Sequence, residues 1–245
     1  MIEAGALKKL AERSQTTFDN AVREYLQHLF LSFLYREKKS EFLLFKGGTA
    51  LRIVWQSPRF SEDMDFTGTK LSIPEIEKLM ETTLEKIEAE GIKTDVEESK
   101  KTSGGYLAIF RFAADGYESG IQIEVSQRLK TKETGYASLI RPDLIPPYSL
   151  MHLDEKTLVG EKIQAALTRA KARDFYDIYF ILRSRIAFKE TFSKDKTLKS
   201  KLLSAIENQK LDIRSELKTF LPASQHMLLR NFKLTLLSEI KRNLP

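Results

Sequence analysis

The chain has 245 residues, of which 40 are Lys or Arg and 34 are Asp or Glu, giving a formal net charge of +6, and 42% are hydrophobic. This composition is typical of a folded globular protein and excludes disordered, collagen-like and fibrous classes. Because the chain contains no cysteine, it has no disulfide, no cysteine-ligated zinc or iron–sulfur site and no thiol nucleophile.

No segment has the length and character of a membrane span. The longest apolar stretch, Leu29–Tyr35, is short and interrupted by Ser32, and the N-terminus lacks the apolar core of a signal peptide. We therefore expect a soluble, cytoplasmic protein with no membrane partner. The small excess of positive charge is compatible with nucleic acid as a partner and equally with solubility alone.

The first part of the chain is predicted to alternate between helices and strands. Apolar residues at spacings of three and four predict helices over 16–38 and 73–89. The apolar run 41–46 predicts a strand that ends in the turn Gly47-Gly48, after which Thr49 would cap a helix to about residue 55. Further strands are predicted over 64–67, 92–99, 106–112 and 120–127, the last three as a meander.

A proline-rich stretch, 141–147, separates this part from a predominantly helical one. Helices are predicted over 154–172, 174–185, 197–208 and about 223–242. We therefore expect an α+β fold of two domains. The first, 1–148, would contain a mixed sheet and the N-terminal helix, and the second, 149–245, would be helical.

Two short motifs in the first part indicate a site for phosphate and metal. In a strand, residues two apart face the same side, so Asp63 and Asp65 are expected to project together beside the glycine turn. Carboxylates about 4 Å apart repel by roughly 4 kcal/mol at an effective dielectric near 20, and a divalent cation reverses this cost. Oxygen ligands of this kind suit Mg²⁺ or Mn²⁺.

The turn Gly47-Gly48 allows close approach of a phosphate, and the Thr49 hydroxyl can donate to phosphate oxygens. Taken singly, each motif has a simpler interpretation as a tight turn or a solvated strand end.

A third carboxylate, Glu124, lies between Ile123 and Val125 on a predicted strand and faces the opposite side from them. It would complete a metal site or act as a general base; the alternative is an exposed strand glutamate.

In the helical part, Lys162 and Arg169 share one face of the predicted helix 154–172, which indicates a clamp for phosphates. For Asp174 and Asp177, helix capping and a functional role both remain open. Arg59 has two interpretations as well, an ion pair with a carboxylate or a contact with substrate. The three histidines show no metal-binding spacing.

Five features of the sequence, taken in chain order, resemble the motifs of the AbiEii/AbiGii toxin family of the nucleotidyltransferase superfamily. They are Lys-Gly-Gly-Thr-Ala-Leu, Arg-x-Ser-x-Asp-x-Asp-Phe, a strand carboxylate, Glu-Lys-x-x-Ala and Arg-Asp-x-x-Asp. The resemblance covers about residues 41–183 and implies a polymerase-β-like sheet. It further implies that Asp63 and Asp65 hold Mg²⁺ and that Lys162 contacts phosphate oxygens. Asp174 matches the acidic position of the last motif, and Glu124 replaces an aspartate frequent at the third carboxylate.

The resemblance implies a metal-dependent nucleotidyltransferase, the toxin of a toxin–antitoxin or abortive-infection system, that transfers NMP from an NTP to an acceptor such as a tRNA 3′ end. Its partners would be the NTP, an RNA acceptor and a cognate antitoxin. The alternatives are a non-catalytic nucleotide- or RNA-binding protein and a nucleotidyltransferase that modifies protein. The expected catalytic residues are Asp63, Asp65, Glu124, Lys162 and Asp174; the expected nucleotide-binding residues are Gly47, Gly48, Thr49, Lys162 and Arg169.

Overall fold

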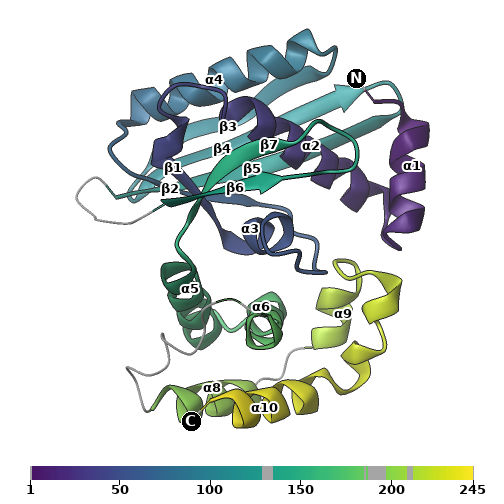
Figure 1. The fold of residues 1–245 in the computed structure, drawn as a ribbon, viewed down its shortest axis with the longest axis vertical. Helices are drawn as coiled ribbons and strands as arrows, with labels where there is room; N and C mark the ends of the chain where they lie inside the picture. The colour runs from purple at the N-terminus through teal and green to yellow at the C-terminus, as the bar shows by residue number, and fades with distance from the viewer. Residues whose placement is uncertain (1, 129–134, 185, 187–196, 209–211, 245) are drawn as a thin grey trace. The chain divides into compact units, whose positions relative to one another are not determined.

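The computed structural model describes residues 2–128, 135–184, 186, 197–208 and 212–244 (Figure 1). The chain divides into two compact units, one made of Met1–Gln56 and Phe60–Leu153 and the other of Ser57–Arg59 and Asp154–Pro245. The division after Leu153, rather than at the expected residue 148, follows from a strand over 148–153 that belongs to the sheet. No helix among the described residues is long and apolar enough to cross a membrane.

The first unit is built on a mixed sheet that has seven strands among the described residues, in the order β3-β4-β5-β2-β1-β7-β6. β3, β4 and β5 form the predicted antiparallel meander, while β2 pairs with β5 and β1 with β7 in parallel. The predicted mixed sheet is thus confirmed. The strands are β1 (Leu43–Lys46), β2 (Met64–Gly68), β3 (Lys93–Thr102), β4 (Gly105–Ala114), β5 (Tyr117–Gln127), β6 (Gly135–Ile140) and β7 (Tyr148–Leu153).

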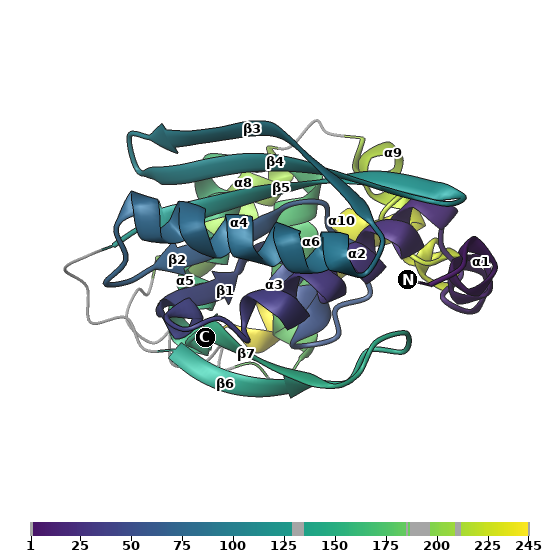
Figure 2. The same ribbon diagram turned by 90° about the horizontal axis from the view of Figure 1, so that it is seen from above.

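Two long helices, α2 (Phe18–Leu34) and α4 (Ile73–Ala89), pack with one face of the sheet, as Figure 2 shows from above. The predicted helix 73–89 has the predicted bounds, because Ser72 and Glu75 form a capping box at its start. The apolar faces of both helices join strand residues such as Phe45 and Phe66 in one core. Each fully buried large apolar side chain in such a core contributes roughly 1.5–3 kcal/mol.

Several elements of the first unit differ from the prediction. α1 (Ala4–Arg13), β6 and β7 were not predicted. A 3₁₀ turn, η1 (Ser40–Phe42), occupies the start of the predicted strand 41–46, so that β1 begins at residue 43. α3 (Gly47–Ile53) begins at Gly47, so Thr49 lies inside this helix and does not cap it.

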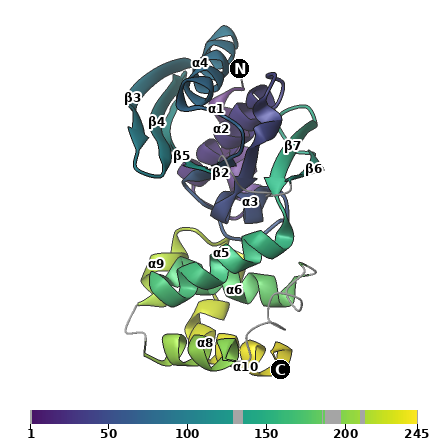
Figure 3. The same cartoon turned by 90° about the vertical axis from the view of Figure 1, so that its left-hand side faces the viewer.

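The second unit consists of helices, among which α5 (Glu155–Thr168) and α6 (Ala172–Arg183) lie side by side (Figure 3). The predicted helices 154–172, 174–185 and 197–208 are confirmed with small changes of bounds; residue 185 lies outside the described residues. The predicted single helix 223–242 is wrong, because two 3₁₀ turns precede its helical end. The other elements are α8 (Leu198–Glu207), α9 (Ile213–Lys218), η2 (Ala223–Gln225), η3 (Leu228–Asn231) and α10 (Phe232–Asn243).

A partly buried histidine, His28, links α2 to β7 and predicts a pH-dependent stability. Nδ1 of His28 lies 2.8 Å from the Tyr148 hydroxyl oxygen, and burial lowers the pKa of His28 from 6.5 to about 4. The unfolded chain therefore binds one more proton than the folded chain between these pH values. Stability is fully present above about pH 6.5 and falls as the pH drops toward 4, by about 3 kcal/mol in total from this group.

Denaturant unfolding at several pH values between 7 and 4.5 measures this effect. We expect a His28→Gln variant to show a shallower loss of unfolding free energy with acid than the wild-type protein. His226→Gln, a substitution in the second unit, serves as the control and is expected to keep the wild-type slope. Equal slopes for wild type and His28→Gln would contradict the assignment.

Candidate active site

Gly47 and Asp65 lie against each other where β1 passes into α3. Lys46, the last residue of β1, is the register partner of Asp65 on β2. Gly47 has a φ of 81°, and a Cβ built on it would overlap the Asp65 carboxylate and lie 2.8 Å from its Cγ. Only glycine fits this position, because any side chain would displace the carboxylate. The predicted glycine turn and the predicted carboxylate pair are thus direct neighbours.

Side chains from two helices hold the backbone that leads into β2. Gln27 of α2 donates from Nε2 to the carbonyl oxygens of Ser61, at 2.9 Å, and Glu62, at 3.1 Å. The Thr49 hydroxyl of α3 donates to the next carbonyl oxygen, that of Asp63. Both donors are buried, so three successive carbonyls are fixed from inside the unit. We call Gln27 and Thr49 the entry clamp, because they set the direction in which Asp63 enters the strand.

Sequence reasoning missed Gln27, although a polar amide among the apolar residues of the predicted helix 16–38 was a usable signal. The same geometry bears on Thr49, whose hydroxyl was expected to contact phosphate. In the structure Thr49 is fully buried and its hydroxyl donates to a backbone carbonyl. A contact between Thr49 and phosphate therefore stays a prediction.

The third predicted carboxylate lies beside Asp65. Asp65 and Glu124 are register partners in the parallel pair β2–β5, so Lys46, Asp65 and Glu124 form one row across three central strands. The row occupies the face opposite the apolar core, which the neighbouring positions Phe45 and Phe66 enter. Glu124 is exposed, and its Oε1 accepts a hydrogen bond from Gln122 Nε2 at 2.7 Å.

The chemistry of Asp63 and Asp65 fits a divalent cation, since both offer carboxylate oxygens at alternating positions of one chain segment. Within the described part of the chain, however, no three His, Cys, Asp or Glu side chains are grouped so that they could hold a metal ion. The prediction that Glu124 completes a set of three metal ligands with these two carboxylates is therefore still a prediction. Metal binding by Asp63 and Asp65 stays a prediction.

In the second unit, a buried aspartate holds two cations. Asp177 of α6 accepts from Arg59 Nε at 2.9 Å through Oδ1 and from Lys162 Nζ at 2.7 Å through Oδ2. Burial alone would raise the pKa of Asp177, but the charges of Arg59 and Lys162 hold it below its ordinary value. Of the two interpretations of Arg59, the ion pair with a carboxylate is confirmed.

The second predicted cation has a different partner. Arg169 Nε donates to Asp174 Oδ2 at 3.0 Å, and a second contact joins its guanidinium to the other oxygen. Asp174 Oδ2 also accepts from the Lys171 backbone N–H at 3.1 Å, so the capping interpretation of Asp174 is confirmed, with the helix beginning at Ala172. Lys162 and Arg169, predicted as one phosphate clamp, are thus each paired with a separate buried aspartate.

The predicted residues fall into two sets. The glycine turn, Asp63, Asp65 and Glu124 belong to the first unit, whereas Lys162, Arg169 and Asp174 belong to the second. A common site formed by the two sets stays a prediction.

Removal of the Gln27 amide tests the entry clamp. Gln27→Leu keeps the length of the side chain but leaves two backbone carbonyls without their donor, so we expect a loss of about 1–3 kcal/mol in unfolding free energy. Thermal and denaturant unfolding measure it. Gln56→Leu, at an exposed position after α3, is the matched control and is expected to change stability by less than about 0.5 kcal/mol. Equal stability of the two variants would contradict the role of Gln27.

A mixed sheet that carries a glycine turn against an aspartate pair, with a helix directly after the turn, defines the class of nucleotidyltransferase folds. Two solved structures share this fold. JHP933 from Helicobacter pylori is 20% identical, with 93% of this chain and 92% of that chain covered and a TM-score of 0.62. MenT4, a nucleotidyltransferase toxin from Mycobacterium tuberculosis, is 15% identical, with 99% and 93% covered and a TM-score of 0.63.

A family model matches residues 30–235 and is described as the nucleotidyl transferase AbiEii toxin of a type IV toxin–antitoxin system. The chain belongs to this family of nucleotidyltransferase toxins, and the resemblance seen in its motifs is confirmed. The search of curated proteins finds no match.

Proposed function

We propose that this protein is a metal-dependent nucleotidyltransferase toxin that transfers NMP from an NTP to an RNA acceptor such as the 3′ end of tRNA. The observation that carries the proposal is the direct contact of the Gly47 turn with Asp65 at the start of β2. Phosphate approaches a backbone most closely at glycine, and carboxylates are the ligands that Mg²⁺ and Mn²⁺ prefer. The turn therefore lies where a metal-bound triphosphate needs both groups.

In the proposed reaction, an acceptor hydroxyl releases its proton to water and attacks the α-phosphorus of the NTP, and the bond from that phosphorus to the oxygen bridging to the β-phosphate breaks. Pyrophosphate leaves on the opposite side. When bound to Asp63 and Asp65, Mg²⁺ or Mn²⁺ supplies the positive charge that makes the hydroxyl more acidic and neutralises the leaving group. The entry clamp holds the backbone of Asp63, so the two carboxylates are positioned before the substrate binds.

We assign Lys162 and Arg169 to the phosphates of the NTP. Each is held by a buried aspartate, which fixes the side chain before binding and reduces the entropy lost on contact. In this proposal Asp174 orients Arg169, and Asp177 orients Lys162. The family also supports a cognate antitoxin as a partner. The substrates, an NTP and tRNA, place the proposed activity in the cytoplasm.

A labelling experiment tests the proposal. Purified protein is incubated with Mg²⁺, total tRNA and each α-labelled NTP in turn, and the products are separated on a denaturing gel. Asp65→Asn removes a charge from the site without changing side-chain size, and Asp95→Asn makes the same change at an exposed position of β3. We expect label in RNA with the wild-type protein and with Asp95→Asn, and none with Asp65→Asn.

Two other outcomes would contradict the RNA acceptor. Label on a protein band would favour the alternative in which the enzyme modifies protein. Absence of label from every product, with NTP binding retained, would favour a nucleotide-binding protein without transfer activity.

A further inference from the structure

A shallow groove lies beside Glu124 on the polar face of the first unit's sheet. Its volume is about 250 Å³, and its lining includes Thr102, Leu107, Glu124 and Ser126. Glu124 is the register partner of Asp65, so the groove begins one strand away, about 4.8 Å in the pairing direction, from the proposed catalytic carboxylate.

Two lining residues of the groove, Thr102 and Ser126, belong to one register row of the sheet. Ser126 on β5, Gly105 on β4 and Thr102 on β3 are successive register partners in one row across the sheet. A Cβ on Gly105 would lie 2.9 Å from the Gln127 backbone nitrogen and closer still to the Val125 carbonyl oxygen, so the position accepts only glycine. Two hydroxyl-bearing residues, Ser126 and Thr102, therefore stand on either side of a glycine in the row, and both line the groove together with Glu124.

The same row continues on its other side to Thr67, the register partner of Ser126 on β2. Thr67 is fully buried, and its hydroxyl has no hydrogen-bond partner among the described residues. Buried hydroxyls are nearly always satisfied in folded proteins. Because Thr67 is buried, its hydroxyl lies beneath the surface and does not line the groove.

Glu124 has the free capacity to bind neutral hydroxyl groups. Its Oε1 accepts from Gln122, whereas its Oε2 has no partner among the described residues. Two glutamates of β3, which lies beyond β4 in the same sheet, differ, because Glu97 pairs with Arg111 and Glu98 with Lys100. An exposed carboxylate without a cation repels phosphate but accepts hydrogen bonds from hydroxyls. Acidic residues bind ribose hydroxyls in this way in dinucleotide-binding folds.

We propose that Glu124, together with the hydroxyls of Thr102 and Ser126, binds the 2′ and 3′ hydroxyls of a ribose and does not serve as a third metal ligand. The inference rests on the proposed function, which places the reacting phosphate beside Asp65. It agrees with the lack of a three-carboxylate group among the described residues. The ribose belongs either to the incoming nucleotide or to the terminal residue of the RNA acceptor, and the two sources are separated by experiment.

The first experiment measures the affinity for Mn²⁺, and bound and free Mn²⁺ are distinguished by electron paramagnetic resonance. Glu124→Ala is compared with Glu118→Ala, which removes an exposed glutamate from the same strand and the same face, and with Asp65→Asn. We expect both glutamate variants to bind Mn²⁺ within about twofold of wild type and Asp65→Asn to bind it much more weakly. A loss of Mn²⁺ affinity in Glu124→Ala equal to that in Asp65→Asn would overturn the proposal.

The second measurement is equilibrium binding of ligands that cannot react. One arm compares the α,β-methylene analogues of the four NTPs with their 2′-deoxy forms, and the other compares tRNA ending in ribose with tRNA ending in 2′,3′-dideoxyribose. In one of the two arms, we expect wild type and Glu118→Ala to bind the ligand with the complete ribose about tenfold more tightly than the deoxy ligand. This is the factor expected when a ligand lacks one hydroxyl that donates a hydrogen bond to a carboxylate. Glu124→Ala is expected to lose this preference, and the arm in which it does so identifies the source.

If Glu124→Ala keeps the wild-type preference in both arms, or if wild type shows none in either, the ribose assignment is wrong. Both arms measure binding and not transfer. Failure of the labelling experiment therefore refutes the proposed reaction without deciding the role of Glu124, and the two failures are distinguishable.

Discussion

Replacing Asp177 with alanine is expected to lower the free energy of unfolding by about 3–5 kcal/mol, because it leaves two buried cations without their shared partner. The side chains of Arg59 and Lys162 are only 4% and 10% exposed, and both donate to the Asp177 carboxylate. Most of the loss in unfolding free energy comes from the charges of Arg59 and Lys162, which stay buried without the Asp177 carboxylate.

Denaturant unfolding followed by circular dichroism measures this loss. Glu81→Ala is the matched control, since its ion pair with Lys78 is 67% and 60% exposed, and we expect it to cost less than about 0.5 kcal/mol. The pKa of Asp177 is lowered on folding from 3.8, so its contribution is present above about pH 4 and is lost as the pH falls through the folded value. Equal destabilisation by the two variants at pH 7 would contradict the buried network.

The substitution Gly47→Ala is expected to reduce nucleotidyl transfer by about 100-fold. The added methyl group would occupy space that the Asp65 carboxylate fills, and displacement of a reacting group by about 1 Å costs a factor of this order. Alanine also disfavours the φ of 81° at this position, which adds a cost of about 1–3 kcal/mol in stability. Activity and stability should therefore fall together.

Gly160→Ala provides the control for this prediction. Gly160 lies inside α5, and a Cβ there would meet nothing within 4 Å. Because alanine is the better helix former, we expect stability to rise by roughly 0.5–1 kcal/mol and the transfer rate to stay unchanged. The label incorporated per unit time measures the rate for both variants. Wild-type activity in Gly47→Ala would show that the contact with Asp65 has no part in the reaction.

The elements that the sequence predicted well are those decided by nearby residues. Helix 73–89 has its signals within it and at its start, where Ser72 and Glu75 form the capping box. β7 was missed because its place depends on parallel pairing with β1, through Phe45 and His152, more than a hundred residues apart. Neither partner carries a local signal for that pairing.

In the candidate site too, contacts between nearby residues were predictable and contacts between distant residues were not. The contact of Gly47 with Asp65 follows from a short strand–turn–helix and strand, so the motifs predicted it. The donors of the entry clamp come from separate helices, and Gln27 lies 34 residues from Ser61 in sequence. Residue spacing within one helix or strand cannot predict a contact between residues so far apart in the sequence. The register that places Glu124 beside Asp65 likewise emerges only when the whole sheet is assembled.

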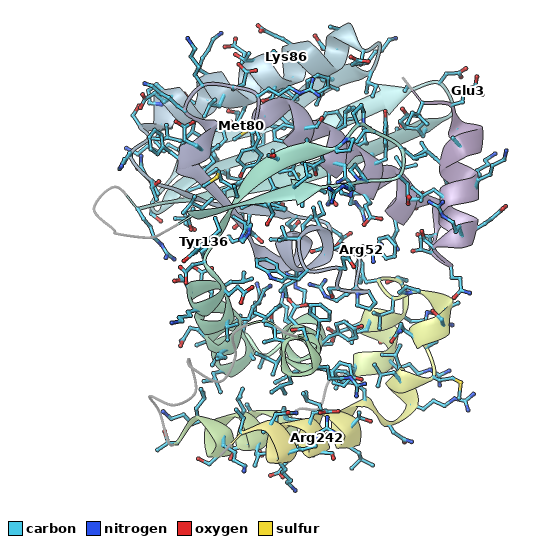
Figure 4. All side chains as sticks on the ribbon, viewed as in Figure 1. Glu3, Arg52, Met80, Lys86, Tyr136 and Arg242 are labelled. Atoms are coloured by element: carbon cyan, nitrogen blue, oxygen red, sulfur yellow. The ribbon has the colours of Figure 1, made fainter. Side chains whose placement is uncertain are left out.

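Arg52, which Figure 4 labels, holds the start of the chain that follows Arg59. Its guanidinium lies 3.9 Å from the Phe60 ring centroid and pairs with Glu24 at 2.6 Å. These contacts hold the residue directly after Arg59 within the first unit, while Arg59 itself belongs to the second. The chain thus changes units between two adjacent residues.

This crossing has a consequence for synthesis of the protein. Arg59 leaves the ribosome 118 residues before Asp177, which at about 5–20 residues per second is a delay of roughly 6–24 seconds. During that time the nascent sheet unit carries a cation whose carboxylate has not yet been made. A single cut after Leu153 also fails to separate the units, because the N-terminal piece keeps Ser57–Arg59 and the C-terminal piece keeps Asp177. A cut at this boundary would therefore place the two sides of the buried network on separate pieces of chain.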